Sequence, residues 1–266
     1  MTPIVSGTPA PVISEAPTTA IATTAVPTTT EAPTTTVEAT TTTLVPANIV
    51  DVGAFPVPIV PVGMGSGADT AVVQLRLVQL GFWVAPTDGN YGLTTKQAVM
   101  AFQKYLGLDA TGAVDDGTAA YLTQYSIKAH GQADAGTLVE VDKARQLLFI
   151  SVDGVPLWTF NSSTGNGQPF DEPDKNTPGG PNITGVALTP DGLWKVNRER
   201  PDGWWEGDLG KIYRPKYFHG GIAVHGSNSV PNYPASHGCV RVSVPAMDFI
   251  WDSGIIPMKM TVWVHS

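Results

Sequence analysis

Apolar positions with helical spacing predict three short helices in the first half of the chain. In the first stretch Val72, Leu75 and Val78 recur every third residue, which predicts a helix that buries these three side chains. Asp69 is the expected cap at the start of this helix, and Gly81 is the expected stop.

The second stretch begins with Thr94, and Gln97 follows three residues later, which is the spacing of a capping box. Its expected apolar face consists of Ala98, Val99, Phe102, Tyr105 and Leu106. A third short helix is predicted after Asp115, with Ala119 and Leu122 among its apolar positions.

Beyond residue 136 the pattern changes to short runs of apolar, β-branched and aromatic residues. The runs at residues 147–152 and 157–160 flank Asp153-Gly154, a dipeptide typical of tight hairpin turns. Further short strands are expected at residues 138–141, 193–196, 221–224, 239–242 and 260–264. Many short strands separated by Gly and Pro turns favour a β-sandwich or a barrel-like fold.

One helix is predicted within this β-rich part, from Pro245 to Trp251, with Ser243 as its cap and Gly254 as its stop. The aromatic-rich residues 202–218 are expected to form a long excursion from the strands. Their tryptophans and tyrosines either line a cleft or cover an edge of the core, and the sequence supports both interpretations equally.

The N-terminal part has a different composition. Residues 1–47 are mainly Thr, Pro and Ala, with too little apolar surface to offset the entropy of ordering, so we expect a disordered and semi-extended tail. Residues 48–63 are apolar but interrupted by proline, which predicts an extended strap against the domain that follows. The tail is either a spacer or a low-complexity segment without a role.

Together these patterns predict a multidomain α+β protein. The expected divisions are a stalk and strap over residues 1–63, a three-helix module over 64–126, a linker over 127–136 and a mostly-β domain over 137–266. The formal net charge of -8 argues against nucleic acid as a partner, because no basic patch is available to neutralise phosphates.

The chain contains a single cysteine, Cys239, which excludes an internal disulfide framework. His237 lies two residues before it and His225 fourteen residues before it. An imidazole can take the proton from a thiol, and Gly238 allows a tight turn in which backbone amides converge on an oxyanion. The alternatives are an inert buried thiol and a zinc site of these two histidines and the cysteine, although His-x-Cys is not a usual zinc spacing.

The segment His225-Gly226, followed by Ser236-His237-Gly238-Cys239-Val240-Arg241, resembles the signature of the YkuD-type L,D-transpeptidases, bacterial enzymes that cross-link peptidoglycan. The resemblance implies that Cys239 is the nucleophile and His225 the general base. The positions that it implies for oxyanion and substrate binding are Ser236, His237, Gly238, Arg241 and Gly226. For residues 137–266 it implies a YkuD-type sandwich.

The helical stretch resembles the small three-helix peptidoglycan-binding module over residues 64–126. The turn Asp88-Gly89-Asn90-Tyr91-Gly92 carries part of this resemblance, which implies glycan-peptide binding near Asp88, Gly89 and Tyr91. Each of these residues also suits a turn, cap or core position, so an appendage that has lost its ligand is the alternative.

The resemblance implies a peptidoglycan L,D-transpeptidase that links stem peptides through a cysteine thioester and needs no metal or organic cofactor. The alternatives are an L,D-carboxypeptidase that hydrolyses the same bond and a non-catalytic cell-wall-binding protein. Expected partners are peptidoglycan stem peptides and glycan, and carbapenem β-lactams are expected to acylate the cysteine.

This function implies an extracytoplasmic location, either secreted or associated with the cell wall. The chain has no apolar run of the roughly 18 residues that a transmembrane helix needs, and Met1 to Val5 do not begin a secretory signal. We therefore expect an export signal upstream of the sequence given.

Overall fold

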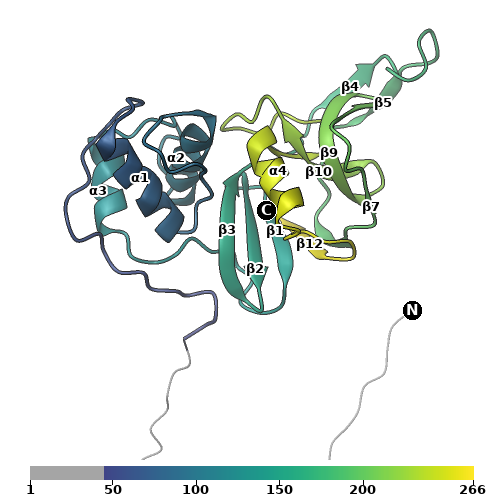
Figure 1. Cartoon of the computed structure of the whole chain (residues 1–266). Coiled ribbons are helices and arrows are strands. Elements are labelled where there is room, and N and C mark those ends of the chain that lie inside the picture. Colours follow the sequence, from purple (N-terminus) through teal and green to yellow (C-terminus); the bar gives the residue numbers. More distant parts are fainter. Residues whose placement is uncertain (1–44) are drawn as a thin grey trace, which may run out of the picture. The chain divides into compact units, whose positions relative to one another are not determined.

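The computed structural model describes residues 45–266. Most of the predicted tail lies outside the described residues. The part that is described begins with the strap and continues into three helices, α1 (Ala68–Gln79), α2 (Leu93–Tyr105) and α3 (Asp116–Gln124) (Figure 1). Twelve strands and one further helix follow. Among residues 45–266 no helix is both long and apolar enough to cross a membrane.

The strap packs against the helices, as its apolar residues led us to expect. Ile59 is buried, and Phe55 contacts the same apolar cluster. The backbone amides of Val52 and Phe55 donate to the carbonyl oxygens of Ser126 and Thr123 at 2.7 Å each.

Helix α1 forms where it was predicted, but the predicted cap was wrong and the predicted apolar face was only partly right. The N-cap is Gly67, and Asp69 lies in the first turn. Leu75 is half exposed, whereas Val73 and Leu77 are fully buried. Val72 and Val78 are partly buried against the same apolar cluster. The three-residue spacing missed the centre of the buried face because it ignored a polar residue in the core.

That polar residue is Arg76, which is 1% exposed. Its guanidinium donates to the carbonyl oxygens of Leu122, Tyr125 and Gly53. Each of these acceptors lies outside α1, so the buried charge joins the helix to α3 and to the strap. A buried cation is tolerated when its donors are satisfied in this way.

The predicted capping box of α2 is also wrong. The N-cap is Gly92, and no side chain caps this helix. The expected apolar face is correct for Ala98, Val99 and Phe102, which are buried. The cap of α3 is confirmed, because Asp115 accepts a hydrogen bond from the Thr118 amide at 2.7 Å.

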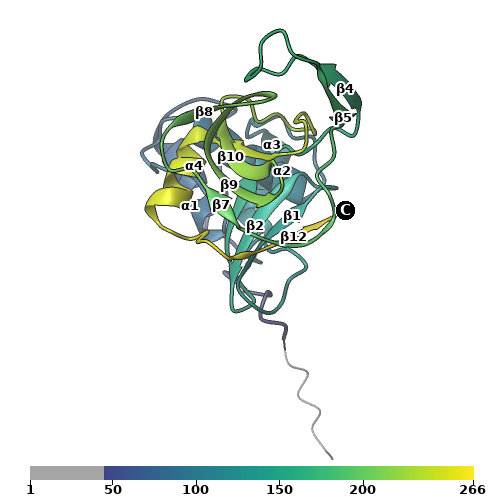
Figure 2. The same ribbon diagram turned by 90° about the vertical axis from the view of Figure 1, so that its right-hand side faces the viewer.

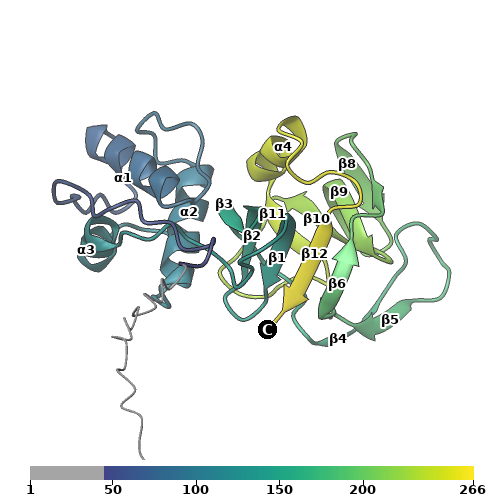
Figure 3. The ribbon, with the colours of Figure 1, turned by 90° about the horizontal axis from the view of Figure 1, so that it is seen from below.

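The strands form two five-stranded sheets and a small two-stranded hairpin. The first sheet has the order β3-β2-β1-β12-β6, and Figure 3 shows β12 between β1 and β6. The second has the order β11-β10-β9-β7, with β8 paired to β9. The strand bounds are β1 Leu138–Asp142, β2 Leu147–Val152, β3 Val155–Asn161, β4 Pro169–Glu172, β5 Ile183–Val186, β6 Gly192–Lys195, β7 Arg198–Glu199, β8 Trp204–Gly207, β9 Gly210–His219, β10 Ile222–Ser227, β11 Val240–Ser243 and β12 Thr261–His265.

Local signals placed several of these elements correctly. Asp153 and Gly154 have φ values of 51° and 80° and connect β2 to β3 as a tight turn. The N-cap of helix α4 (Val244–Asp252) is Ser243, whose hydroxyl accepts a hydrogen bond from the Ala246 amide. The strands β4 and β5 pair only with each other and project from the second sheet (Figure 2).

Strand β2 divides the apolar interior into two clusters. Leu148 and Ile150 belong to a core shared by both sheets and α4, whereas Leu147 and Phe149 belong to the cluster of the three helices. Alternate side chains of a strand point to opposite faces of its sheet. The first sheet is therefore covered by helices on one face and by the second sheet and α4 on the other, which confirms the mostly-β sandwich with one short helix.

Candidate functional site

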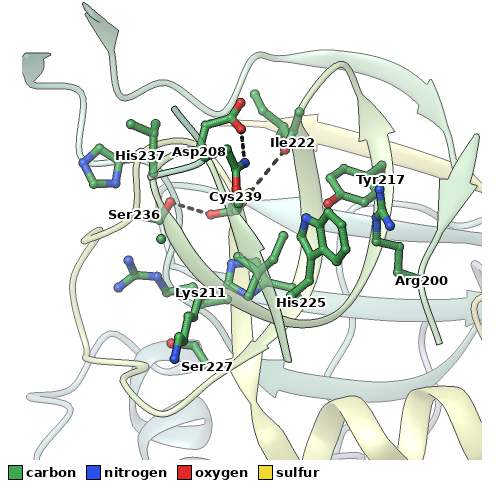
Figure 4. Close-up of a pocket in the computed structure, with 18 of the residues that line it drawn as sticks. Arg200, Asp208, Lys211, Tyr217, Ile222, His225, Ser227, Ser236, His237 and Cys239 are labelled. Atoms are coloured by element: carbon green, nitrogen blue, oxygen red, sulfur yellow. Dashed lines mark hydrogen bonds between the residues drawn. The ribbon is translucent and has the colours of Figure 1, made fainter. Parts of the chain in front are cut away.

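The pairing of β10 with β11 brings the predicted base and the cysteine segment together. These strands are parallel, and His225 is the register partner of Arg241. Cys239 precedes Arg241 by two residues, so both side chains leave the chain on the same face. The three residues line one cavity of about 590 Å³ (Figure 4).

Cys239 is partly buried at this cavity. Its Sγ donates a hydrogen bond to the carbonyl oxygen of Gly221 at 3.7 Å. Burial raises the pKa of the Cys239 thiol, while a hydrogen bond from the Ala223 backbone and the charge of Arg241 act in the opposite direction. The resting side chain is therefore a neutral thiol next to a cation that favours its ionised form.

His225 is 3% exposed, and its Nδ1 lies 2.8 Å from the carbonyl oxygen of Gly226. A carbonyl can only accept, so this bond places the imidazole proton on Nδ1 and leaves Nε2 unprotonated. Burial lowers the pKa of His225 to about 4; the Gly226 bond opposes this shift and the charge of Arg241 adds to it. At neutral pH the ring is a neutral acceptor, as a general base must be.

The loop before the cysteine is fixed by Ser236 and Thr189. Ser236 Oγ accepts from the Gly238 amide at 3.0 Å and donates to the Cys239 carbonyl. Thr189 Oγ1 donates to the Gly238 carbonyl at 2.6 Å. Because the Gly238 amide already donates to Ser236, it is not available as an oxyanion donor. Gly238 instead contributes to the shape of the loop.

His237 has its side chain on the far side of this loop. Its Nε2 lies 2.7 Å from Glu172 on β4, and its ring contacts Phe170 edge-on. In Figure 4 the imidazole points away from Cys239. Any role of His237 near the sulfur therefore belongs to its backbone amide.

Gly226 lies on β10 beside His225 but faces the opposite side of the strand. A Cβ atom there would lie 2.9 Å from the Tyr213 ring and 3.1 Å from Met247 Cβ. The residue therefore allows close packing, and its carbonyl sets the tautomer of His225. Gly226 is not among the residues that line the cavity.

Several cavity residues were not singled out in the sequence. They come from β7, the segment after it and the β8–β9 hairpin: Arg198, Arg200, Trp205, Asp208, Lys211 and Tyr217. The aromatic residues of the 202–218 excursion therefore have both roles that the sequence left open, lining a cleft and packing at the edge of the core. Trp205 and Tyr217 line the cavity, whereas Trp204 packs on Tyr213 with ring centroids 5.2 Å apart.

The predicted ligand-binding residues of the helical module have structural contacts. Asp88 accepts from the backbone and the side chain of Asn90. Gly89 has a φ of 82° and donates to Gln74. The Tyr91 hydroxyl donates to the Gly112 carbonyl at 2.6 Å. These contacts bring the three residues to one turn, and peptidoglycan binding there stays a prediction.

Two family profiles match the chain. The one described as the L,D-transpeptidase catalytic domain matches residues 136–264, which contain both sheets. The one described as a peptidoglycan binding domain matches residues 66–122, which contain α1 and α2 and most of α3.

The chain is also similar to solved structures. An L,D-transpeptidase from Xylanimonas cellulosilytica is 40% identical, with a TM-score of 0.70, over 79% of this chain and 99% of that chain. An L,D-transpeptidase from Stackebrandtia nassauensis is 20% identical, with a TM-score of 0.41, over 76% of this chain and 92% of that chain.

Among curated proteins, N-acetylmuramoyl-L-alanine amidase CwlM from Mycobacterium tuberculosis is 46% identical over 46 residues. The match covers 17% of this chain and 11% of the amidase. The chain therefore spans only about a tenth of the length of this curated relative.

Proposed function

Because the chain belongs to the L,D-transpeptidase family, enzymes that act on peptidoglycan, we propose that it links stem peptides through a thioester on Cys239. The observation that supports this most directly is the β10–β11 register, which brings Cys239, His225 and Arg241 to one cavity. The proposed donor is a stem peptide that ends in a D-residue. The scissile bond is the peptide bond that joins this D-residue to the carbonyl group at the L-centre of the third residue.

In the first half-reaction Cys239 Sγ attacks the carbonyl carbon of this bond. The thiol proton moves to Nε2 of His225 and then to the leaving amine of the D-residue, whose C–N bond breaks as the thioester remains. In the second half-reaction an amine of another stem attacks the thioester. His225 takes the amine proton and returns it to the sulfur as the C–S bond breaks.

The electrostatics favour proton transfer during the attack rather than before it. The pKa of His225 is about 4 and burial raises that of the thiol. Each unit of pKa difference corresponds to about 1.4 kcal/mol, so an isolated transfer from sulfur to imidazole is uphill. Arg241 acts on both partners, because its charge stabilises the anionic sulfur and disfavours the protonated imidazole.

The amides of His237 and Cys239 are the proposed donors to the oxyanion of the tetrahedral intermediate. Preorganised amide donors of this kind contribute about 3–4 kcal/mol each in acyl-transfer enzymes. Ser236 and Gly238 hold the loop in place for them through the hydrogen bonds described above. Metal or cofactor chemistry has no part in this proposal.

We also propose that the helical module binds peptidoglycan and that the protein acts in the cell wall, after export. Both matched families concern peptidoglycan, which supports this location. The expected acylation by carbapenems follows from family membership and needs the same nucleophile.

The experiment is an incubation of the protein with a purified disaccharide tetrapeptide, followed by mass spectrometry of the products. A dimer joined between third residues, formed by the protein and not by Cys239→Ala, is the expected result. Release of the terminal D-residue without a dimer would indicate a carboxypeptidase instead. A dimer formed equally by Cys239→Ala would overturn the proposal.

A further inference from the structure

The cavity around Cys239 is more positive than the rest of the chain. Among the described residues that line it, the cationic ones are Arg198, Arg200, Lys211 and Arg241. Among the same described lining residues, the acidic one is Asp208, whose carboxylate accepts a hydrogen bond from the side-chain amide of Asn176 at 2.6 Å. The whole chain has a formal net charge of -8. A positive cavity in an acidic protein is suited to an anionic ligand.

Arg200 has a donor that the protein does not use. Its Nε is buried and has no hydrogen-bond partner among the described residues. Its guanidinium lies 3.6 Å from the ring centroid of Trp205, and its backbone amide donates to Pro215 at 3.0 Å. Stacking on the indole holds the guanidinium flat, and its two terminal nitrogens can then meet a planar carboxylate in the cavity with two parallel hydrogen bonds.

Arg198 places a second cation close to this donor. Its guanidinium lies 3.9 Å from the ring centroid of Tyr217, its register partner across β7 and β9. Burial raises the pKa of the Tyr217 hydroxyl, both arginines lower it and the Cys239 thiol adds a smaller upward effect, so these groups lie near one another. In Figure 4 Arg200 and Tyr217 lie together on one side of the cavity, and Cys239 lies between them and His237.

We propose that Arg200, supported by Arg198, binds a carboxylate of the donor stem peptide and makes the enzyme prefer that acid over its amide. This proposal rests on the proposed function, because it concerns the substrate of the same cavity. Arg241 is a separate cation, since it lies at the reacting centre beside His225 and Cys239.

Two carboxylates of such a donor have the required chemistry. One belongs to the terminal D-residue, which leaves when the thioester forms. The other belongs to the side chain of the third residue, when that residue is a diamino diacid. They lie on opposite sides of the scissile bond, so synthetic donors that lack one or the other are needed to distinguish them.

The experiment uses the full chain and three synthetic donors: the diacid, its terminal carboxamide and its side-chain carboxamide. For the natural protein we expect kcat/KM to be about 10- to 100-fold lower for one of the two amides, as for loss of a charged hydrogen bond. Arg200→Met should lower kcat/KM for the diacid by a similar factor, mainly through KM. In this variant the ratio of kcat/KM for the diacid to kcat/KM for that same amide, the acid-to-amide ratio, should be near one. Arg200→Lys should restore part of the preference, because it keeps the charge but loses the fork.

Lys195→Met is the matched control, because it removes a positive charge from an exposed position on β6 outside the cavity. It should keep the acid-to-amide ratio of the natural protein. A ratio unchanged in Arg200→Met, or equal use of all three donors by the natural protein, would overturn the proposal.

A parallel measurement separates this proposal from the proposed function. Iodoacetamide is neutral and small, so its reaction with Cys239 reports the nucleophile and not the carboxylate site. If Arg200→Met is alkylated at the rate of the natural protein but has an acid-to-amide ratio near one, the result supports a carboxylate site at Arg200. Failure of the natural protein to form any cross-linked product would instead contradict the proposed function.

Discussion

Gln97 of α2 donates a hydrogen bond to the carbonyl oxygen of Val230 at 3.2 Å. Val230 lies in the loop between the proposed base and the proposed nucleophile. Asn161 at the end of β3 strengthens the contact, because its Nδ2 donates both to Gln97 at 2.6 Å and to Val230 at 3.2 Å. The helical module therefore holds a segment of the catalytic loop.

Gln97→Ala should weaken this loop. Loss of two partly buried hydrogen bonds is expected to lower the free energy of unfolding by about 1–2 kcal/mol, which shifts the melting temperature by a few degrees. Acylation of Cys239 by a carbapenem should slow several-fold, because the loop ends at the cysteine segment. Differential scanning fluorimetry and stopped-flow fluorescence measure the two effects.

Thr94→Ala is the matched control for this prediction. If Gln97 acted with Thr94 as a capping box, both substitutions would destabilise α2 alike. Since no side chain caps this helix, Thr94→Ala should change stability by only a few tenths of a kcal/mol and leave acylation unchanged. Equal effects of the two variants would contradict the loop contact.

Gln97 was predicted to form a capping box and instead contacts Val230 and Asn161, which shows which features a sequence can predict. The hairpin at Asp153-Gly154 and the cap of α4 at Ser243 depend on neighbours within a few residues, so their patterns were sufficient. Gln97 has a local pattern too, but its partners are 64 and 133 residues away. Tertiary contacts override a local propensity when they satisfy the same side chain better.

The candidate site divides in the same way. The cysteine segment and His225 could be predicted because their types and spacing resemble a family signature. Arg198 and Arg200 could not, because they reach the cavity only through the pairing of β7 with β9, and nothing local in Arg-Glu-Arg indicates this pairing. The centre of the buried face of α1 was missed for a related reason, since Arg76 is satisfied by carbonyl groups far along the chain.

His225 should keep its function well below pH 6. Because burial lowers its pKa from 6.5 to about 4, Nε2 stays unprotonated and able to accept a proton down to that range. The acid limb of the pH profile for acylation of Cys239 is therefore expected near pH 4, and His225→Gln should lack it and react slowly at every pH. A midpoint near pH 6.5 would show that the imidazole is solvated during the reaction.

The same group should make stability depend on pH. Its folded-state pKa is depressed, so the stabilisation is present above pH 6.5 and is lost as the pH falls through 4. The full difference corresponds to about 3 kcal/mol. Urea unfolding of the protein and of His225→Gln at pH 7.5 and pH 4 measures it: the advantage of the natural protein should shrink at the lower pH.

Lys104 on α2 should show a second pH effect, at the contact between the helices and the first sheet. Its Nζ is buried and donates to the carbonyl oxygens of Gln146 and Ser162. Burial lowers its pKa from 10.5 to about 7, so the stability linked to its neutral form is present above pH 10.5 and is lost as the pH falls through 7.

Lys104→Met removes this titration and fills nearly the same volume. Relative to the variant, the natural protein should gain stability between pH 6.5 and pH 9.5 in urea unfolding. Comparing the two proteins cancels the other groups that titrate in this range. Parallel curves would show that the two carbonyl acceptors hold the ammonium charged throughout.

Gly238 should tolerate no side chain. Its φ of 140° is accessible almost only to glycine, and a Cβ atom would lie 2.7 Å from the carbonyl oxygen of Leu188. Gly238→Ala should therefore displace the loop that carries the Ser236 and Thr189 hydrogen bonds and lower the rate of Cys239 acylation at least about tenfold, a barrier increase of about 1.4 kcal/mol.

Gly167→Ala is the control, because Gly167 also has a positive φ, of 75°, but its Cβ would meet nothing within 4 Å. That variant should lose only about 1–2 kcal/mol of stability and keep its acylation rate; a similar loss of rate in both would mean that backbone strain alone, and not the contact with Leu188, controls the loop.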